Sequence, residues 1–140
     1  MPQPVNLKLK AIQHIGIPVT NIKVSESFYH NLGFENVMQS GFMHNNEEGI
    51  CIMMRQGNIV IELYQMPLEE LAAIAVRKDG HIDHVAFDVD DIDATFSVLS
   101  AAGYHIIESA PMQLNFWKNG CKYFNMLGPD GERLEFNQVL

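Results

Sequence analysis

Two segments of the chain, residues 11–19 and 82–89, alternate between apolar and polar positions with the period of two that half-buried strands show. Each segment is followed by apolar residues at helical spacing, and these stretches end at Gly33 and Gly103, where a C-terminal helix cap belongs. We therefore predict a strand and then a helix in each half of the chain. The apolar strand residues expected to face the helices are Ile15, Ile17, Val19, Val85, Phe87 and Val89.

The two predicted helices have matching caps and apolar stripes. Thr20 or Asn21 would cap the first helix and Asp90 or Asp91 the second, because their side-chain oxygens accept from the free N–H groups of a first turn. The residues expected to face the sheet are Ile22, Phe28, Leu32, Ile92, Phe96 and Leu99.

Later runs of apolar residues predict three further strands in each half. Residues 67–80 would link the halves, and they contain a helix-like stretch from Leu68 to Val76. The predicted strands cover residues 34–43, 50–55, 59–65, 104–109, 120–127 and 132–138.

An internal repeat organises these elements. After the hairpin turns predicted at residues 55–58 and 127–131 the offset between the halves changes from 70 to 73, so that Glu62 aligns with Glu135. We place the three extra residues in the second turn, where added length costs least. The sequence thus predicts one α+β domain, residues 1–140, of two paired βαβββ modules at about 11–66 and 81–138. Identical pairs at offset 70 are Ile12/Ile82, His14/His84, Val19/Val89, Ile22/Ile92, Ser27/Ser97, Gly33/Gly103 and Cys51/Cys121.

Composition limits the partners of the chain. Its 9 basic and 17 acidic residues give a net charge of −8 without a basic cluster, which argues against binding to nucleic acid or an anionic membrane. We expect a small-molecule partner. Two cysteines and no secretory leader favour a reducing compartment, so we expect a cytoplasmic protein. The longest apolar run, Leu71 to Val76, is far too short to cross a bilayer.

Four polar residues interrupt otherwise apolar strands at repeat-related positions: His14, Glu62, His84 and Glu135. Alternation places them on the sheet face away from the helices, and a buried carboxylate there requires a cation, hydrogen bonds or solvent. Pairing the modules by a pseudo-twofold axis can gather two imidazoles and two carboxylates. Such a set balances a divalent charge and leaves two octahedral positions open, which is typical of a catalytic metal site.

Other readings of individual residues stay open at this point. His81 competes with His84 as a ligand, although Asp83 alternates to the opposite face. Cys51 and Cys121 fit small core residues better than nucleophiles, since no His or cationic run lies nearby in the sequence. The segment 116–120 could be a plain loop or could touch a ligand through Trp117 and Lys118, and residues 128–131 read as a turn.

The chain resembles the vicinal oxygen chelate superfamily, which includes glyoxalase I, methylmalonyl-CoA epimerase, extradiol dioxygenases and bleomycin-binding proteins. The resemblance covers residues 11–138 and implies a curved, open-sided mixed sheet with helices on its outer face, and a homodimer. The motifs that carry it are His14-Ile15-Gly16-Ile17, Ser27-Phe28-Tyr29, Leu32-Gly33, residues 60–63, residues 83–92, and Gly128-Pro129-Asp130-Gly131 before Leu134-Glu135-Phe136.

Within that superfamily the ligand set is similar to that of glyoxalase I-like proteins, whose His, Glu, His and Glu fall on the four residues identified above. The resemblance implies nickel, cobalt or zinc, a lyase that moves a proton through a metal-bound enediolate of a thiol–aldehyde adduct, and Glu135 as the base. Pro18 and Met66 replace the Arg and Asn that contact glutathione in bacterial glyoxalase I, so the thiol is undetermined. The alternatives are an α-proton epimerase resembling methylmalonyl-CoA epimerase and a non-catalytic drug-binding protein.

Overall fold

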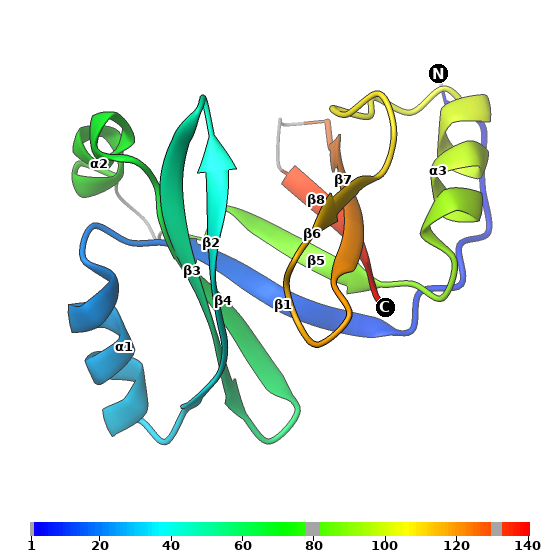
Figure 1. The fold of residues 1–140 in the computed structure, drawn as a ribbon. Helices are drawn as coiled ribbons and strands as arrows, with labels where there is room; N and C mark the ends of the chain where they lie inside the picture. Colours follow the sequence, from blue (N-terminus) through cyan, green and yellow to red (C-terminus); the bar gives the residue numbers. More distant parts are fainter. Residues whose placement is uncertain (1, 78–81, 130–132) are drawn as a thin grey trace. The chain divides into compact units, whose positions relative to one another are not determined.

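Each half of the chain has a strand, a helix and then three strands, and a further helix lies between the halves. The computed structural model describes residues 2–77, 82–129 and 133–140 (Figure 1). Within these ranges the elements are β1 (Ala11–Pro18), α1 (Ile22–Asn31), β2 (Glu35–His44), β3 (Glu47–Gln56), β4 (Ile59–Gln65), α2 (Leu68–Ala75), β5 (His84–Asp88), α3 (Ile92–Ala101), β6 (Met112–Leu114), β7 (Cys121–Leu127) and β8 (Arg133–Val139).

The chain divides into two compact units, and the boundary lies inside β1. The first module is His14–Asp83, and the second module is Met1–Gln13 together with His84–Leu140. The first holds strands in the order β2-β3-β4-β1 and the second in the order β5-β8-β7-β6. The α+β class and the two βαβββ modules are therefore confirmed, and their union into one domain stays a prediction.

In the first module, α1 packs on one face of the sheet. Its core contains Ile22 of α1 and the sheet residues Ile52 and Leu63, with Ile15 and Ile17 packed against them, as the alternation predicted. The predicted inward positions of Phe28 and Leu32 are wrong, because these side chains are 59% and 55% exposed. The inward helical position belongs instead to Tyr29, which contacts Phe34 edge to face and packs on the core; Phe28 is one step further around the helix.

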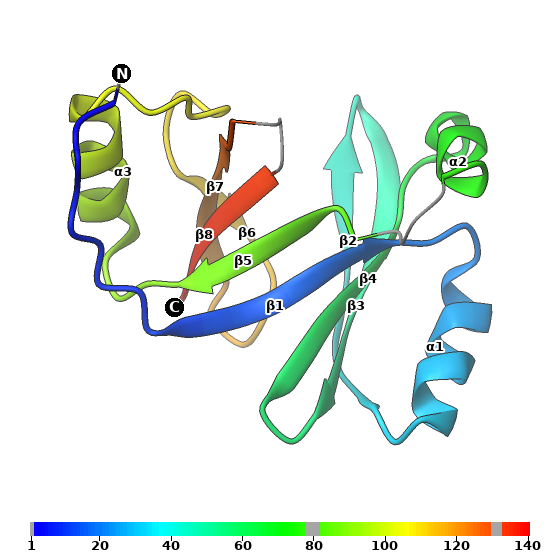
Figure 2. The same cartoon turned by 180° about the vertical axis from the view of Figure 1, so that it is seen from behind.

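In the second module, α3 packs on β7 and β8. The predicted inward residues Ile92, Phe96 and Leu99 are confirmed, since Ile92 and Leu99 are buried in the core cluster and Phe96 packs against it. The residues before β1 belong to this module and run beside α3 in both views (Figures 1 and 2). Val5 and Leu7 pack on its core, and the Gln3 N–H donates to the carbonyl of Ala102 at 2.8 Å.

Caps and glycines define the ends of the two helices as predicted. The side chain of Asn21 accepts from the N–H of Val24, and that of Asp91 from the N–H of Ala94. Gly33 and Gly103 follow the helices with φ of 96° and 86°, which few residues other than glycine adopt. The helix-like stretch in the predicted linker is α2. No helix in the described ranges is long and apolar enough to span a bilayer.

The predicted strand at residues 104–109 is wrong. Only one bridge forms there, between Ile106 and Met126, and ladder pairing with β7 resumes at β6. The cause lies in Glu108, whose carboxylate accepts the backbone N–H of Asn125 at 2.6 Å. A side chain thus takes the donor that the strand ladder would have used.

Strand register also corrects the position of the extra residues in the repeat. Met53 lies opposite Glu62, and Asn125 lies opposite Glu135. The paired residues of β3 and β7 are thus 125 − 53 = 72 positions apart, whereas the two glutamates are 135 − 62 = 73 apart. Only one extra residue therefore lies in the hairpin turn, and the other two precede β7.

The identical pair Cys51 and Cys121 is consequently not equivalent in structure. Cys51 lies opposite Tyr64, whereas Cys121 lies opposite Val139. Both side chains are buried and neither forms a disulfide, but neither belongs to the helix-packed cores. Register places both cysteines on the faces that carry the His and Glu residues. Their exposed fractions of 1% and 0% agree with the expectation of small buried core residues.

Candidate metal-binding residues and their support

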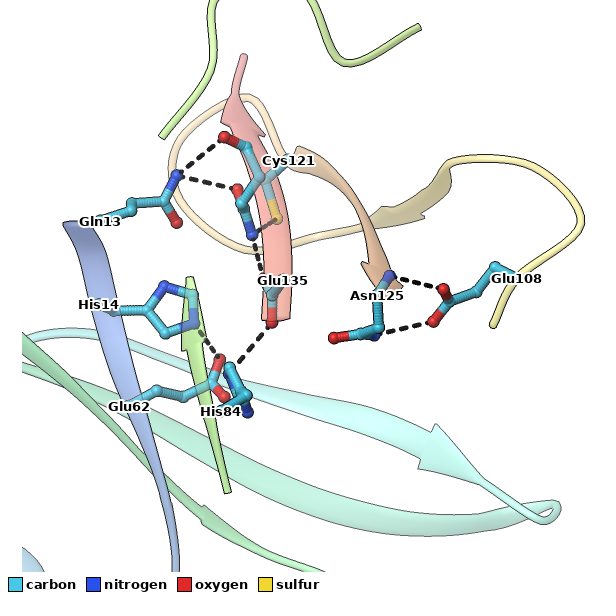
Figure 3. A network of polar contacts seen from close by, with 9 residues as sticks. Gln13, His14, Glu62, His84, Glu108, Cys121, Asn125 and Glu135 are labelled. Atoms are coloured by element: carbon cyan, nitrogen blue, oxygen red, sulfur yellow. Dashed lines mark hydrogen bonds and ion pairs between the residues drawn. The ribbon is translucent and has the colours of Figure 1, made fainter. Parts of the chain in front are cut away.

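The first module brings His14 and Glu62 together. The parallel register of β1 and β4 sets Gly16 beside Glu62, so His14 lies two residues away on the same face. Its Nε2 is 3.8 Å from Oε2 of Glu62, and the imidazole is 1% exposed (Figure 3). This separation exceeds a hydrogen bond. The pair faces away from the core under α1, as predicted.

The second module repeats this arrangement with a closer pair. The β5–β8 register sets Ala86 beside Glu135, and His84 lies two residues before Ala86. Nε2 of His84 is 3.0 Å from Oε2 of Glu135, within hydrogen-bond range. Each module thus joins one imidazole to one carboxylate. The competing candidate, His81, lies outside the described residues.

A series of side-chain hydrogen bonds supports the Glu135 carboxylate through the oxygen that does not face His84. Nδ2 of Asn137 donates to Oε1 of Glu135 at 2.7 Å, and Nε2 of Gln13 donates to Oδ1 of Asn137 at 3.1 Å (Figure 3). The Gln13 amide also donates to Oδ1 of Asp88 at 3.1 Å. Since Oε1 is engaged by Asn137, Oε2 is the oxygen turned to His84.

Asp88, the last acceptor in this series of hydrogen bonds, also contacts Lys10 at the surface. Its ammonium lies 3.3 Å from Oδ2 of Asp88 and 3.0 Å from Oδ1 of Asp90. These hydrogen bonds, that to Asp90 first, raise the pKa of Lys10 above its usual value. A surface cation is thus linked to the buried Glu135 through Asp88, Gln13 and Asn137.

Sequence reasoning missed Gln13, Asn125 and Asn137. Asn137 carried a signal, because it is a polar residue two positions after Glu135 in a strand that packs on the core. Gln13 carried none, since its partner lies 124 residues away.

The segment 116–120 was interpreted either as a plain loop or as a ligand contact. Within it, Phe116 is buried at 4% exposure and Lys118 is exposed.

The donor types in both modules fit a first-row divalent cation. Imidazole nitrogen and carboxylate oxygen suit zinc, nickel and cobalt, and the hydrogen bond from Asn137 is the kind of outer contact that orients metal-ligating carboxylates. Together with the two βαβββ modules, these pairs define a protein of the vicinal oxygen chelate class.

The chain belongs to the Glyoxalase/Bleomycin resistance protein/Dioxygenase superfamily, whose family model matches residues 11–136. The superfamily assignment made from the sequence is thereby confirmed. Its closeness to glyoxalase I within the superfamily stays a prediction.

Two bacterial relatives match almost the whole chain. The uncharacterized protein YwbC of Bacillus subtilis is 32% identical over 135 residues, which cover 92% of this chain and 98% of that protein. The uncharacterized protein YaeR of Escherichia coli is 30% identical over 131 residues, covering 92% and 96%. This chain is therefore similar to both over nearly their full lengths.

Among solved structures, the fold is similar to methylmalonyl-CoA epimerases. The enzyme from Streptomyces coelicolor, in complex with 2-nitronate-propionyl-CoA, has a TM-score of 0.75 at 20% identity, covering 94% of this chain and 99% of its own. The epimerase from Mycobacterium tuberculosis has a TM-score of 0.76 at 19% identity, covering 99% and 93%. At this identity the likeness concerns the fold.

Proposed function

We propose that this protein is a divalent-metal-dependent, glyoxalase I-like lyase that moves a proton between adjacent carbons of a thiol–aldehyde adduct. The observation that carries the proposal is the His–Glu pair on the helix-free face of each module. Superfamily membership adds support, because members are often metal-dependent enzymes. The proposal includes a homodimer in the cytoplasm.

In this proposal His14, Glu62, His84 and Glu135 would hold one divalent cation together. The support is the repeat, which supplies the same two donor types at equivalent positions of both modules. When bound, nickel, cobalt or zinc would supply Lewis acidity toward adjacent substrate oxygens. Two imidazoles and two carboxylates balance the charge of such an ion.

Glu135 is the proposed base. Its Oε2 would take the proton from one substrate carbon and return it to the neighbouring carbon, while Asn137 keeps Oε1 hydrogen-bonded. The buried setting, with Glu135 at 7% exposure, limits proton exchange with water. Pro18 and Met66 stand where glutathione contacts would lie in bacterial glyoxalase I, so the proposal leaves the thiol open.

The substitution Glu135→Gln tests the base. It keeps the size of the side chain and an oxygen for a cation but removes the proton acceptor, so turnover of methylglyoxal with glutathione or another thiol should fall by at least about 10³-fold. Bound zinc, measured in the purified protein, should fall only modestly. Glu35→Gln, at an exposed strand end, is the matched control. Turnover that survives in Glu135→Gln would place the base elsewhere.

A second candidate is an epimerase that removes and replaces the α-proton of an acyl thioester, and the fold likeness to methylmalonyl-CoA epimerases favours it. Turnover of a racemic acyl-CoA, with no turnover of the aldehyde and thiol, would select this candidate. A purified protein that binds ligands but no divalent ion would instead support the drug-binding alternative.

A further inference from the structure

A buried hydrogen-bond acceptor without a partner lies beside the second His–Glu pair. The side chain of Asn125 is on β7, and the residue is 8% exposed. Its Oδ1 accepts no hydrogen bond within the part of the chain that the structure describes. Buried polar atoms almost always find partners, so an unmatched one calls for an explanation such as a bound ligand.

Glu108 fixes which way the Asn125 amide points. Nδ2 of Asn125 donates to Oε1 of Glu108 at 2.8 Å, and the backbone N–H of Asn125 donates to Oε2 at 2.6 Å. An ionised carboxylate only accepts, so the reversed amide would set oxygen against oxygen. The orientation is therefore determined, and Oδ1 points away from Glu108 (Figure 3).

Strand register places this acceptor on the face of the proposed base. Asn125 lies directly opposite Glu135 in the antiparallel pair of β7 and β8. Its neighbours Phe124 and Met126 point the other way, into the core under α3. Figure 3 shows the Asn125 oxygen on the side of the amide that faces the Glu135 carboxylate. A group handled by Glu135 would lie within reach of Oδ1, because opposed side chains of such a pair are neighbours.

We infer that Oδ1 of Asn125 accepts a hydrogen bond from a hydroxyl group of the substrate, next to the carbon from which Glu135 removes a proton. This inference rests on the proposed function and narrows it. A thiol–aldehyde adduct carries such a hydroxyl, and so does its 2-hydroxy thioester product. A methylmalonyl thioester carries an ionised carboxylate at that carbon instead, which offers no hydrogen to an acceptor and would repel it.

Glu108 acts in this inference as a positioning residue. It does not touch the substrate, but it holds the amide with its oxygen outward. At the equivalent position of the first module the residue opposite Glu62 is Met53, which is 1% exposed and has no amide oxygen to offer. The hydroxyl-binding role therefore belongs to the second module alone.

Two matched thioesters test the inference. S-lactoyl-N-acetylcysteamine and S-propionyl-N-acetylcysteamine differ by one hydroxyl, and their affinities for the zinc-loaded protein can be measured by calorimetry. The wild type should bind the lactoyl compound at least about tenfold more tightly, because one well-placed hydrogen bond in a buried site adds about tenfold to any preference that zinc shows for adjacent oxygens. Asn125→Leu should lower this preference by about tenfold relative to the wild type, with its zinc affinity unchanged within about threefold.

Glu108→Gln provides a second variant that keeps the shape of the site. A glutamine can accept or donate, so the Asn125 amide is free to reverse, and the preference should fall by about threefold or more relative to the wild type. Glu69→Gln, on the exposed side of α2, should keep the full preference. Equal binding by the wild type, or a preference that Asn125→Leu leaves unchanged, would overturn the inference. A wild type that shows the preference, and loses it in Asn125→Leu, but turns over no aldehyde–thiol mixture would overturn the proposed function and leave only the contact between Asn125 and a ligand hydroxyl.

Discussion

Gln13, near the start of β1, supports the Glu135 carboxylate through Asn137. Its replacement by methionine should lower both the thermal stability of the protein and its affinity for zinc. Gln13→Met keeps the length of the side chain and removes the amide that donates to Asp88 and Asn137. The Asn137 amide then loses the contact that fixes its orientation, so its hydrogen bond to Glu135 is no longer enforced.

The expected loss of stability follows from the bonds removed. A hydrogen bond contributes about 1 kcal/mol net, and a buried acceptor left unmatched costs about 1–3 kcal/mol. The side chain of Asp88 is 25% exposed and also contacts Lys10, so water replaces part of what it loses. Most of the loss in unfolding free energy therefore comes from Oδ1 of Asn137, which loses its donor, and amounts to about 1–2 kcal/mol. For a chain of this size that lowers the Tm by about 3–6 °C.

The second effect concerns zinc. Loss of an outer contact to a metal ligand commonly weakens binding by about 10–100-fold, and we expect about 10-fold here because Asn137 itself remains. Calorimetry gives the Tm, and competition with a chromophoric chelator gives the zinc Kd. Gln39→Met, on the exposed edge strand β2, should change neither. A Tm within 1 °C of the wild type at an unchanged zinc Kd would refute the supporting role of Gln13.

Two further predictions concern the second module. Phe124 is fully buried between Phe96 and Phe136, with ring distances of 5.2 Å. The substitution Phe124→Ala should therefore lower the free energy of unfolding of the protein, measured by urea titration, by about 3–5 kcal/mol. Phe28→Ala, at an exposed position, should lower it by less than about 1 kcal/mol. Asp91→Ala removes the cap on the N–H of Ala94 and should cost about 1 kcal/mol in the same titration; an unchanged midpoint would contradict that role.

Much of the fold was predictable because local signals agreed with the repeat. Alternation in β1 and β5 identified both helix-packed faces, and the caps at Asn21 and Asp91 fixed where the helices begin. The pairs His14–Glu62 and His84–Glu135 were predictable for the same reason. A charged or ionisable residue in an apolar strand requires a partner, and the repeat pointed to it.

The failures arose where tertiary contacts overrode local pattern. Residues 104–109 look like a strand, but the side chain of Glu108 takes the N–H that would extend the ladder. Phe28 fits a helical stripe, yet the sheet under α1 accommodates Tyr29. The identity of Cys51 with Cys121 suggested one register, whereas strand pairing follows another. In each case the deciding partner is distant in sequence.

The differences between the two modules bear on which carboxylate is the proposed base. By sequence repeat Glu62 and Glu135 are equivalent, so their neighbours must distinguish them. Beside Glu135 lie Asn125, with its outward acceptor, and Asn137, which holds one carboxylate oxygen; at the same two positions beside Glu62 lie Met53 and Tyr64. A base needs an oriented substrate, which the outward acceptor of Asn125 would supply beside Glu135, whereas the residue opposite Glu62 is Met53. This asymmetry favours Glu135 independently of any resemblance.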